Sequence, residues 1–281
     1  MRVQLDCFPC FLRQVIIALR LGTKDESVQE AILKSTFEDI RKTDTTKPPA
    51  FTTTFIHRKI RQMLGRDPFK EIKSEYNQIA LRLYPSLKNT SEKSPDPLWT
   101  SARLAIAGNV IDFGIFTSID VEGTISKALN SPLAVDDFNS FKNAIFNADR
   151  ILYLTDNAGE IVFDRILIET LTSLGKDVKA VVKGSPVIND STMEDADESG
   201  LTGVCEVIDN GSEAVGTILE WTSTSFQKTF KDAQLVISKG QGNFETLIGV
   251  KKKIFFLLQS KCKVVSKELG LSTGSMLLKK S

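Results

Sequence analysis

The sequence has little of several features that would direct it to a particular chemistry. Its 281 residues include one histidine, His57, and four cysteines. A single histidine excludes a His-rich metal centre and makes a Ser-His-Asp or Cys-His mechanism depend on one residue, which argues against both. No stretch approaches the roughly 18 to 20 uninterrupted apolar residues of a membrane helix. Charges at Arg2, Asp6, Arg13 and Arg20 argue against a signal peptide at the start.

Charge of neither sign dominates the composition. Lys and Arg total 36 and Asp and Glu total 35, for a net charge of +1. Nothing in this balance favours nucleic acid or an anionic membrane as a partner. Because the sequence shows neither a membrane helix nor a signal-peptide pattern, we expect a cytoplasmic protein, and in that compartment cysteines are usually reduced.

The first hundred or so residues have apolar positions at helical spacing. The pattern predicts helices within 7–22, 25–42, 51–64 and 67–87, with a loop at 88–99. A small-residue helix follows over 98–116 and holds Asn109 and Asp112, polar residues that need partners if they are buried.

From about residue 150 short apolar strands alternate with helices. The predicted helices include 161–175 and 211–223. The predicted strands are 150–155, 178–183, 204–208, 234–238, 252–258 and 262–266. This alternation predicts an α/β fold with a largely parallel sheet covered by helices on both faces.

Polar residues gather directly after the predicted strands. They are Asp156, Asn157, Glu160, Asn189, Asp190, Lys239, Asn243 and Lys261. Ligands of open α/β sheets bind at the carboxyl ends of the strands, so these side chains are expected to converge on one edge.

The residue types at this edge suit phosphoryl chemistry. Asp156, Asn157 and Asp190 offer the oxygen ligands that Mg²⁺ or Mn²⁺ prefers. Lys239 can supply positive charge to a phosphate, and the glycine-rich segment 239–243 lets backbone N–H groups approach it. Such a site works mainly by positioning and charge stabilisation.

Each of these features also has a structural interpretation. An Asp-Asn pair after a strand is commonly a turn and a helix cap, and a buried Asn109 and Asp112 can simply tie helices together. Cys7 and Cys10 form a Cys-x-x-Cys pair, but no second pair or histidine cluster completes a zinc site. A redox role would need a βαβ context. The pair can instead provide a helix cap and core packing, or approach the pocket as an accessory ligand.

Five segments, taken together and in order, resemble a known family. CFPC, AGNVIDF, LTDNAGEIVFD, KGSPVINDST and KGQGNFET are similar to the DUF89 family, the damage-control phosphatases. The resemblance covers nearly the whole chain, and Cys-x-x-Cys points to the compact prokaryotic-type branch.

The resemblance implies a fold and an activity. It implies an all-helical N-terminal part, which we assign to 1–105, packed on a Rossmann-like three-layer α/β/α domain, 106–281. It further implies a phosphatase that depends on a divalent metal ion (Mg, Mn, Co or Ni) and acts on small phosphorylated metabolites such as sugar phosphates or damaged phosphometabolites. We expect a monomer or a small homo-oligomer.

The resemblance also implies roles for individual residues. The metal ligands would be Asp156, Asn157 and Asp190, and Asp156 and Lys239 would be catalytic, with Lys239 on the phosphate. The substrate-binding set would be Asn109, Asp112, Glu160, Lys239, Asn243 and Lys261. For Cys7 and Cys10 we favour the structural role over that of an accessory ligand. One departure is Gln259, where the family leads us to expect a Lys or Arg.

Two other classes of function compete with this one. A Rossmann-type protein that binds a nucleotide or S-adenosylmethionine, such as a methyltransferase, would carry G-x-G-x-x-G after its first strand, and TDNAGE lacks that spacing. A non-catalytic binding protein would instead centre a metal or thiol function on Cys7 and Cys10.

Overall fold

The computed structural model describes residues 1–110 and 121–281, and in this part of the chain seven strands form a single sheet. Its order is β1-β7-β6-β5-β2-β3-β4, and every neighbouring pair is parallel except β6 with β7. The strands are β1 (Val135–Asp136), β2 (Arg150–Leu154), β3 (Asp177–Val182), β4 (Glu206–Asp209), β5 (Leu235–Lys239), β6 (Ile254–Gln259) and β7 (Met276–Lys280). The predicted α/β fold with a mostly parallel sheet is confirmed.

Helices cover both faces of this sheet. Helices α5 to α9 share one buried cluster, and α10 to α12 share the cluster on the opposite face. They are α5 (Pro97–Val110), α6 (Val121–Asn130), α7 (Phe138–Phe146), α8 (Glu160–Ser173), α9 (Met193–Glu198), α10 (Thr224–Asp232), α11 (Gln241–Leu247) and α12 (Lys263–Leu269).

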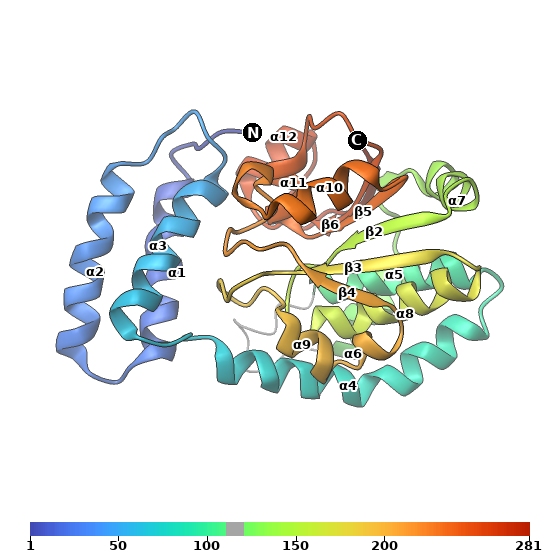
Figure 1. The fold of residues 1–281 in the computed structure, drawn as a ribbon, viewed down its shortest axis with the longest axis horizontal. Helices are drawn as coiled ribbons and strands as arrows, with labels where there is room; N and C mark the ends of the chain where they lie inside the picture. Colours follow the sequence, from blue (N-terminus) through green and yellow to red (C-terminus); the bar gives the residue numbers. More distant parts are fainter. Residues whose placement is uncertain (111–120) are drawn as a thin grey trace.

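The first four helices surround one end and one side of the sheet. Helices α1 (Cys7–Gly22), α2 (Glu26–Arg41) and α3 (Pro49–Leu64) stand side by side at one end, while α4 (Lys70–Glu92) runs back beneath the sheet (Figure 1). The first three share a separate apolar cluster. These three helices, called the helical wall below, face the loops of the α/β part (Figure 1).

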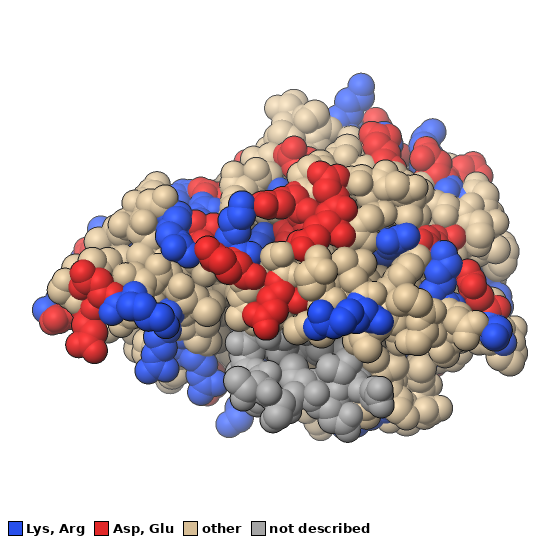
Figure 2. All heavy atoms as spheres, turned by 90° about the horizontal axis from the view of Figure 1, so that it is seen from below, with Lys and Arg blue, Asp and Glu red and all other residues tan. Residues whose placement is uncertain are grey.

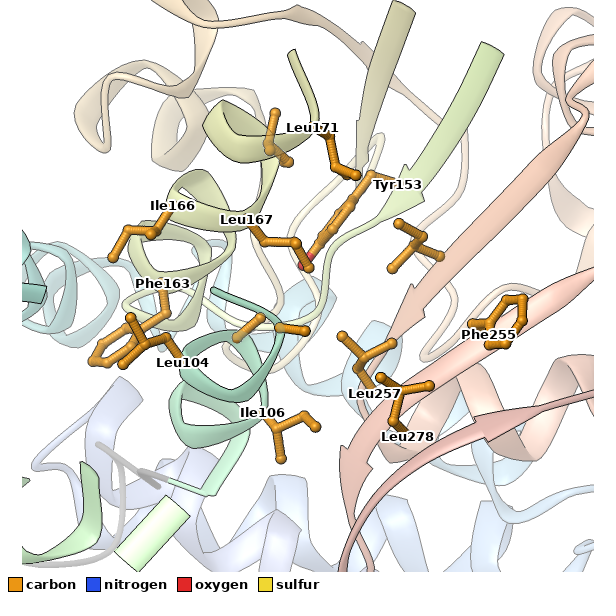
Figure 3. Close-up of a cluster of buried hydrophobic side chains, with 14 of the residues drawn as sticks. Leu104, Ile106, Tyr153, Phe163, Ile166, Leu167, Leu171, Phe255, Leu257 and Leu278 are labelled. Atoms are coloured by element: carbon orange, nitrogen blue, oxygen red, sulfur yellow. The ribbon is translucent and has the colours of Figure 1, made fainter. Parts of the chain in front are cut away.

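The central strand β2 shows why the apolar runs are continuous. Ile151 and Tyr153 belong to the core on one face, and Leu152 and Leu154 to the core on the other. A parallel strand covered on both faces buries every side chain, so its sequence does not alternate. Figure 3 shows Tyr153 among apolar side chains of α5, α8, β6 and β7.

Two local predictions for the helices are wrong. Helix α4 passes through Pro85 and continues to Glu92, into the expected loop at 88–99, because Ala80 and Leu87 on either side of the proline are buried against the core. The segment 211–223, expected to be helical, contains only a short 3₁₀ turn at Leu219–Trp221. Gly211 and Gly216 both have positive φ there, which interrupts a regular helix.

The last strand prediction is also wrong. The expected strand at 262–266 is helix α12, whose first turn is capped by Cys262 Sγ accepting from the Val265 backbone N–H at 3.5 Å. The structure also contains two strands, β1 and β7, that the sequence pattern does not predict.

The surface carries both signs of charge. Figure 2 shows the side of the molecule seen from below Figure 1, where Lys and Arg side chains lie among Asp and Glu side chains. Within residues 1–110 and 121–281, no helix combines the length and the apolarity needed to cross a bilayer.

Candidate functional site

A cavity of about 500 Å³ lies between the sheet loops and the helical wall. One side is lined by Asp156, Asn157 and Asp190, which follow β2 and β3. The opposite side is lined by residues of α1, α3 and α4. The structure thus brings the three predicted metal ligands to one edge of one cavity large enough for a small organic ligand.

Backbone hydrogen bonds hold the loops after β2 and β3 together. Asn157 and Asp190 form an isolated antiparallel bridge. The Ser191 N–H donates to Asp156 O at 2.8 Å, and the Ala158 N–H donates to Asn189 O at 2.9 Å. Asn157 Nδ2 donates to Asp156 Oδ2 at 2.8 Å. The relative positions of Asp156, Asn157 and Asp190 are therefore fixed by main-chain pairing.

Negative charge is concentrated at this edge. Burial, and then the nearby Glu160 and Asp190, raise the pKa of Asp156 well above its ordinary value. Burial also raises the pKa of Asp190, although Lys183 opposes that effect. Apart from its ion pair with Lys183 Nζ at 3.3 Å, Asp190 Oδ2 has no hydrogen-bond partner among the described residues. The carboxylates of Asp156 and Asp190 therefore have less positive charge beside them than would neutralise both.

A hard divalent cation fits this donor set. No three His, Cys, Asp or Glu side chains group as metal ligands anywhere in residues 1–110 and 121–281. The candidate set instead combines two carboxylates with the amide of Asn157. Oxygen donors of this kind suit Mg²⁺ or Mn²⁺, which commonly use one or two carboxylates and keep several waters.

Asn109 connects this edge to the layer beneath it. Its Nδ2 donates to Asp156 Oδ2 at 3.2 Å and to Glu160 Oε2 at 3.0 Å. Its Oδ1 accepts from the Gln259 backbone N–H at 3.0 Å. Asn109 is fully buried and is absent from the cavity lining, so it orients Asp156 and Glu160 from below. Asp112 lies outside the described residues.

Lys239 is also buried beneath Asp156, next to Glu160. Its ammonium donates to Glu160 Oε1 at 2.8 Å, to Asp164 Oδ1 and to the carbonyl of Ala105 at 2.8 Å. The residue is 0% exposed and does not line the cavity. Its three protons are used inside the protein, so it sits differently from the expected phosphate-contacting lysine.

The buried carboxylates respond to Lys239 in different ways. Burial would raise the pKa of Glu160, but Lys239, joined by Lys261 and Asn109, outweighs burial, and the pKa falls below its ordinary value. Burial dominates at Asp164 and raises its pKa to about 7. Tyr153 Oη donates to Asp164 Oδ1 at 2.8 Å.

Replacing Lys239 by methionine is expected to lower the free energy of unfolding by about 3–5 kcal/mol at pH 8. The substitution leaves Glu160 and Asp164 buried without their cation. Urea unfolding of the purified protein measures the loss. The double variant with Asp164→Asn should recover part of it, because one of the stranded charges is removed. A loss below about 1 kcal/mol in Lys239→Met would contradict this account.

The remaining predicted substrate residues divide between the cavity and its support. Lys261 lies on the cavity rim beside Asp156, whose pKa it lowers. Asn243 is buried and donates to Thr155 O at 3.1 Å and to Lys239 O at 2.8 Å, so it fastens the loop after β5. Gln259 turns its side-chain amide to Gly274 O at 3.0 Å.

The Cys-x-x-Cys pair begins helix α1 at the edge of the cavity. Cys7 is buried, Cys10 is exposed, both are free thiols and both line the cavity with Cys262. Burial raises the pKa of both thiols, so neither is activated as a thiolate nucleophile.

Lys183, which is buried and pairs with Asp190, is absent from the predicted site residues. The sequence carried a signal for it, because it stands in the second Lys-Gly pair after a strand. Glu245 and His57 line the cavity. Glu245 carried a signal, because it belongs to the polar, glycine-containing segment that follows a predicted strand. His57 carried none and reaches the cavity from α3. Glu245 accepts from Gln241 Nε2 at 2.9 Å and from the Ala50 backbone near the start of α3.

Glu245→Gln is expected to stabilise the protein at pH 8 but not at pH 5. Burial raises the pKa of Glu245 from 4.5 to about 7. The folded state therefore keeps a proton that the unfolded chain loses, and stability falls as pH rises through this window. Glutamine removes that loss, so the variant should gain about 1–3 kcal/mol relative to wild type between pH 5 and pH 8. Denaturant unfolding at both pH values measures it, and an equal difference at both would contradict the assignment.

The chain is similar to known proteins over nearly its whole length. A family model described as the damage-control phosphatase ARMT1-like domain matches residues 3–277. The chain is 38% identical to the uncharacterized protein MJ0202 of Methanocaldococcus jannaschii, over 99% of this chain and 95% of that one. It is 34% identical to the damage-control phosphatase PH1575 of Pyrococcus horikoshii, over 98% and 97%. A crystal structure of the latter, titled as a DUF89 family protein, superposes with a TM-score of 0.92 over 100% of this chain and 99% of that one.

Proposed function

Because this chain belongs to the damage-control phosphatase family with an ARMT1-like domain, we propose that it is a divalent-metal-dependent phosphomonoesterase of small phosphorylated metabolites. Sugar phosphates and damaged phosphometabolites are the proposed substrates. The observation that carries the proposal is the meeting of Asp156, Asn157 and Asp190 at one edge of a cavity.

Asp156, Asn157 and Asp190 would hold the metal ion, with Mg²⁺, Mn²⁺, Co²⁺ or Ni²⁺ as candidates. Bound there, a divalent ion would polarise a phosphoryl oxygen and neutralise its charge. Lys183 supports this arrangement because it pairs with Asp190 and limits the repulsion between Asp190 and Asp156.

The remaining residues of the site divide into two roles. Lys261 and Lys263 line the rim and can attract the phosphate dianion to the carboxylate edge. Asn109 and Asn157 orient Asp156 through their amide N–H groups. We assign Lys239 a positioning role, as the buried counter-ion that keeps Glu160 ionised beneath these amides.

A metal-by-substrate screen tests the proposal. The purified full-length protein is treated with EDTA and then assayed with p-nitrophenyl phosphate and sugar phosphates in the presence of Mg²⁺, Mn²⁺, Co²⁺ or Ni²⁺. We expect phosphate release that EDTA abolishes and that at least one of the four ions restores. A folded protein that releases no phosphate under any combination would overturn the proposal.

A further inference from the structure

The side of the cavity opposite the metal edge is largely apolar, and no lysine or arginine of the described residues lines it. Its large side chains come from α1, from α4 and from the turn before α4: Phe11, Ile17, Leu21, Phe69, Ile72 and Tyr76. Among the described residues that line the cavity, Lys261 and Lys263 supply the cations, and both lie beyond β6. A second anionic group on a ligand would find no lysine or arginine on this helical side.

His57 does not change that conclusion. It lines the cavity from α3 and is 2% exposed, and burial lowers its pKa to about 3. The imidazole is therefore uncharged at neutral pH. Its Nε2 has no hydrogen-bond partner among the described residues. Like Gln14 and Thr53, which line the same side, it adds a polar but uncharged group to a largely apolar wall.

Ile188 is held in a strained conformation between this wall and the metal edge. Its φ is +46°, and it is the one non-glycine residue with positive φ in residues 1–110 and 121–281. The Asp190 N–H donates to Val187 O at 3.0 Å, so Ile188 is the second residue of a tight turn. Glycine or asparagine normally fills such a position, because a β-branched side chain is strained at positive φ.

The side chain of Ile188 has a use that a glycine could not serve. It lines the cavity two residues before Asp190 and packs against the apolar cluster of α1 to α3. The turn therefore presents a branched apolar group next to the proposed phosphate position. Strain maintained at a cavity wall is typical of a ligand-contacting residue.

We infer that the apolar side of the cavity, called the chamber below, binds the organic group of the phosphate ester and selects an uncharged group with an apolar face. Ile188 is then a specificity-determining residue. The inference rests on the proposed phosphatase function and specifies its substrate class. Esters that carry a second anionic group would be disfavoured, because the carboxylate or second phosphate would be buried against Phe11 and Ile72 without a cation.

A matched pair of esters tests the charge selection. Phenyl phosphate and 4-carboxyphenyl phosphate share the phosphate, the ring and the leaving oxygen and differ by one carboxylate. We expect kcat/KM for phenyl phosphate to be at least about tenfold higher, because an unpaired buried carboxylate is costly. Equal values, or a preference for the carboxylated ester, would overturn the inference.

A matched pair of variants tests Ile188. Ile188→Asn removes the apolar group and relieves the turn, whereas Ile188→Val keeps both the branching and the strain. We expect Ile188→Asn to raise KM for phenyl phosphate about tenfold with little change in kcat or in Tm, because relieved strain offsets lost packing. Ile188→Val should resemble wild type. A large fall in Tm with an unchanged KM would show a purely structural role and overturn the inference.

Binding without turnover separates the inference from the proposed function. The fluorescence of 1-naphthol reports binding to the EDTA-treated protein, and Ile188→Asn should weaken that binding severalfold. Binding of 1-naphthol by a protein that hydrolyses no ester would support the chamber while refuting the phosphatase. Ester hydrolysis by a protein that neither binds 1-naphthol nor discriminates between the two phenyl esters would refute the chamber alone.

Discussion

Asp156→Asn is expected to lower kcat for phosphate release by about a hundred- to a thousandfold, the loss typical when a group that stabilises transition-state charge is removed. Asp156 stands at the centre of the site, bonded to Asn109 and Asn157 and facing Asp190 across the paired loops. Asparagine has the same shape but supplies neither the negative charge nor the second anionic oxygen that a hard cation requires.

The same substitution should not harm the fold. Burial and the neighbouring Glu160 and Asp190 raise the pKa of Asp156, so its charge opposes folding when no metal is present. In EDTA at pH 8 the Tm of Asp156→Asn should therefore equal or exceed that of wild type. Asp177→Asn is the matched control, since Asp177 is exposed at the opposite end of the parallel strands. Full activity in Asp156→Asn, or a similar loss in Asp177→Asn, would contradict the role of Asp156.

Gly240→Ala is expected to lower kcat by about a hundredfold, the cost of misplacing a reacting group by about 1 Å. Gly240 follows β5 with φ of +77°, and a Cβ built on it would lie 1.8 Å from Asp156 Oδ2. The flanking backbone cannot yield easily, because the Gly240 N–H donates to Leu257 O and Asn243 fastens the loop. Asp156 would have to move away from Asn157 and Asp190.

Gly175→Ala is the control that separates the contact between Cβ and Asp156 from the strain of an alanine at positive φ. Gly175 has nearly the same φ, +76°, but a Cβ there would meet nothing within 4 Å. Both substitutions carry a backbone cost of about 1–2 kcal/mol, and urea unfolding should detect it in both. Only Gly240→Ala should lose activity. Equal kcat values for the two variants would show that Gly240 has no role in placing Asp156.

Much of the fold follows from the sequence because its signals are local. The strands β2, β5 and β6 contain continuous apolar runs, β3 is apolar apart from Asp177 and Lys179, and polar residues follow all four where the chain turns. Parallel pairing then brings Asp156 and Asp190 to one edge, a consequence of topology that needs no side-chain detail. The run at 262–266 was ambiguous, because a short apolar segment suits a buried strand or a helix equally well.

The parts that the sequence could not predict depend on tertiary packing. β1 has two residues and pairs in parallel with β7, which itself lies antiparallel to β6, so neither strand gives a pattern that the sequence reveals. Lys239 ends β5, and the sequence does not reveal that its ammonium meets Glu160 and Asp164 beneath the cavity. His57 reaches the cavity only because α3 packs across the sheet loops.

The central claim is that Asp156, Asn157 and Asp190 form a divalent metal site, and anomalous diffraction from crystals soaked in MnCl₂ tests it most directly. We predict one manganese peak in contact with side-chain oxygens of all three residues, absent from crystals of Asp156→Asn. A peak on Cys7 and Cys10 in place of this edge, or no peak in crystals of a protein that manganese activates, would contradict the account.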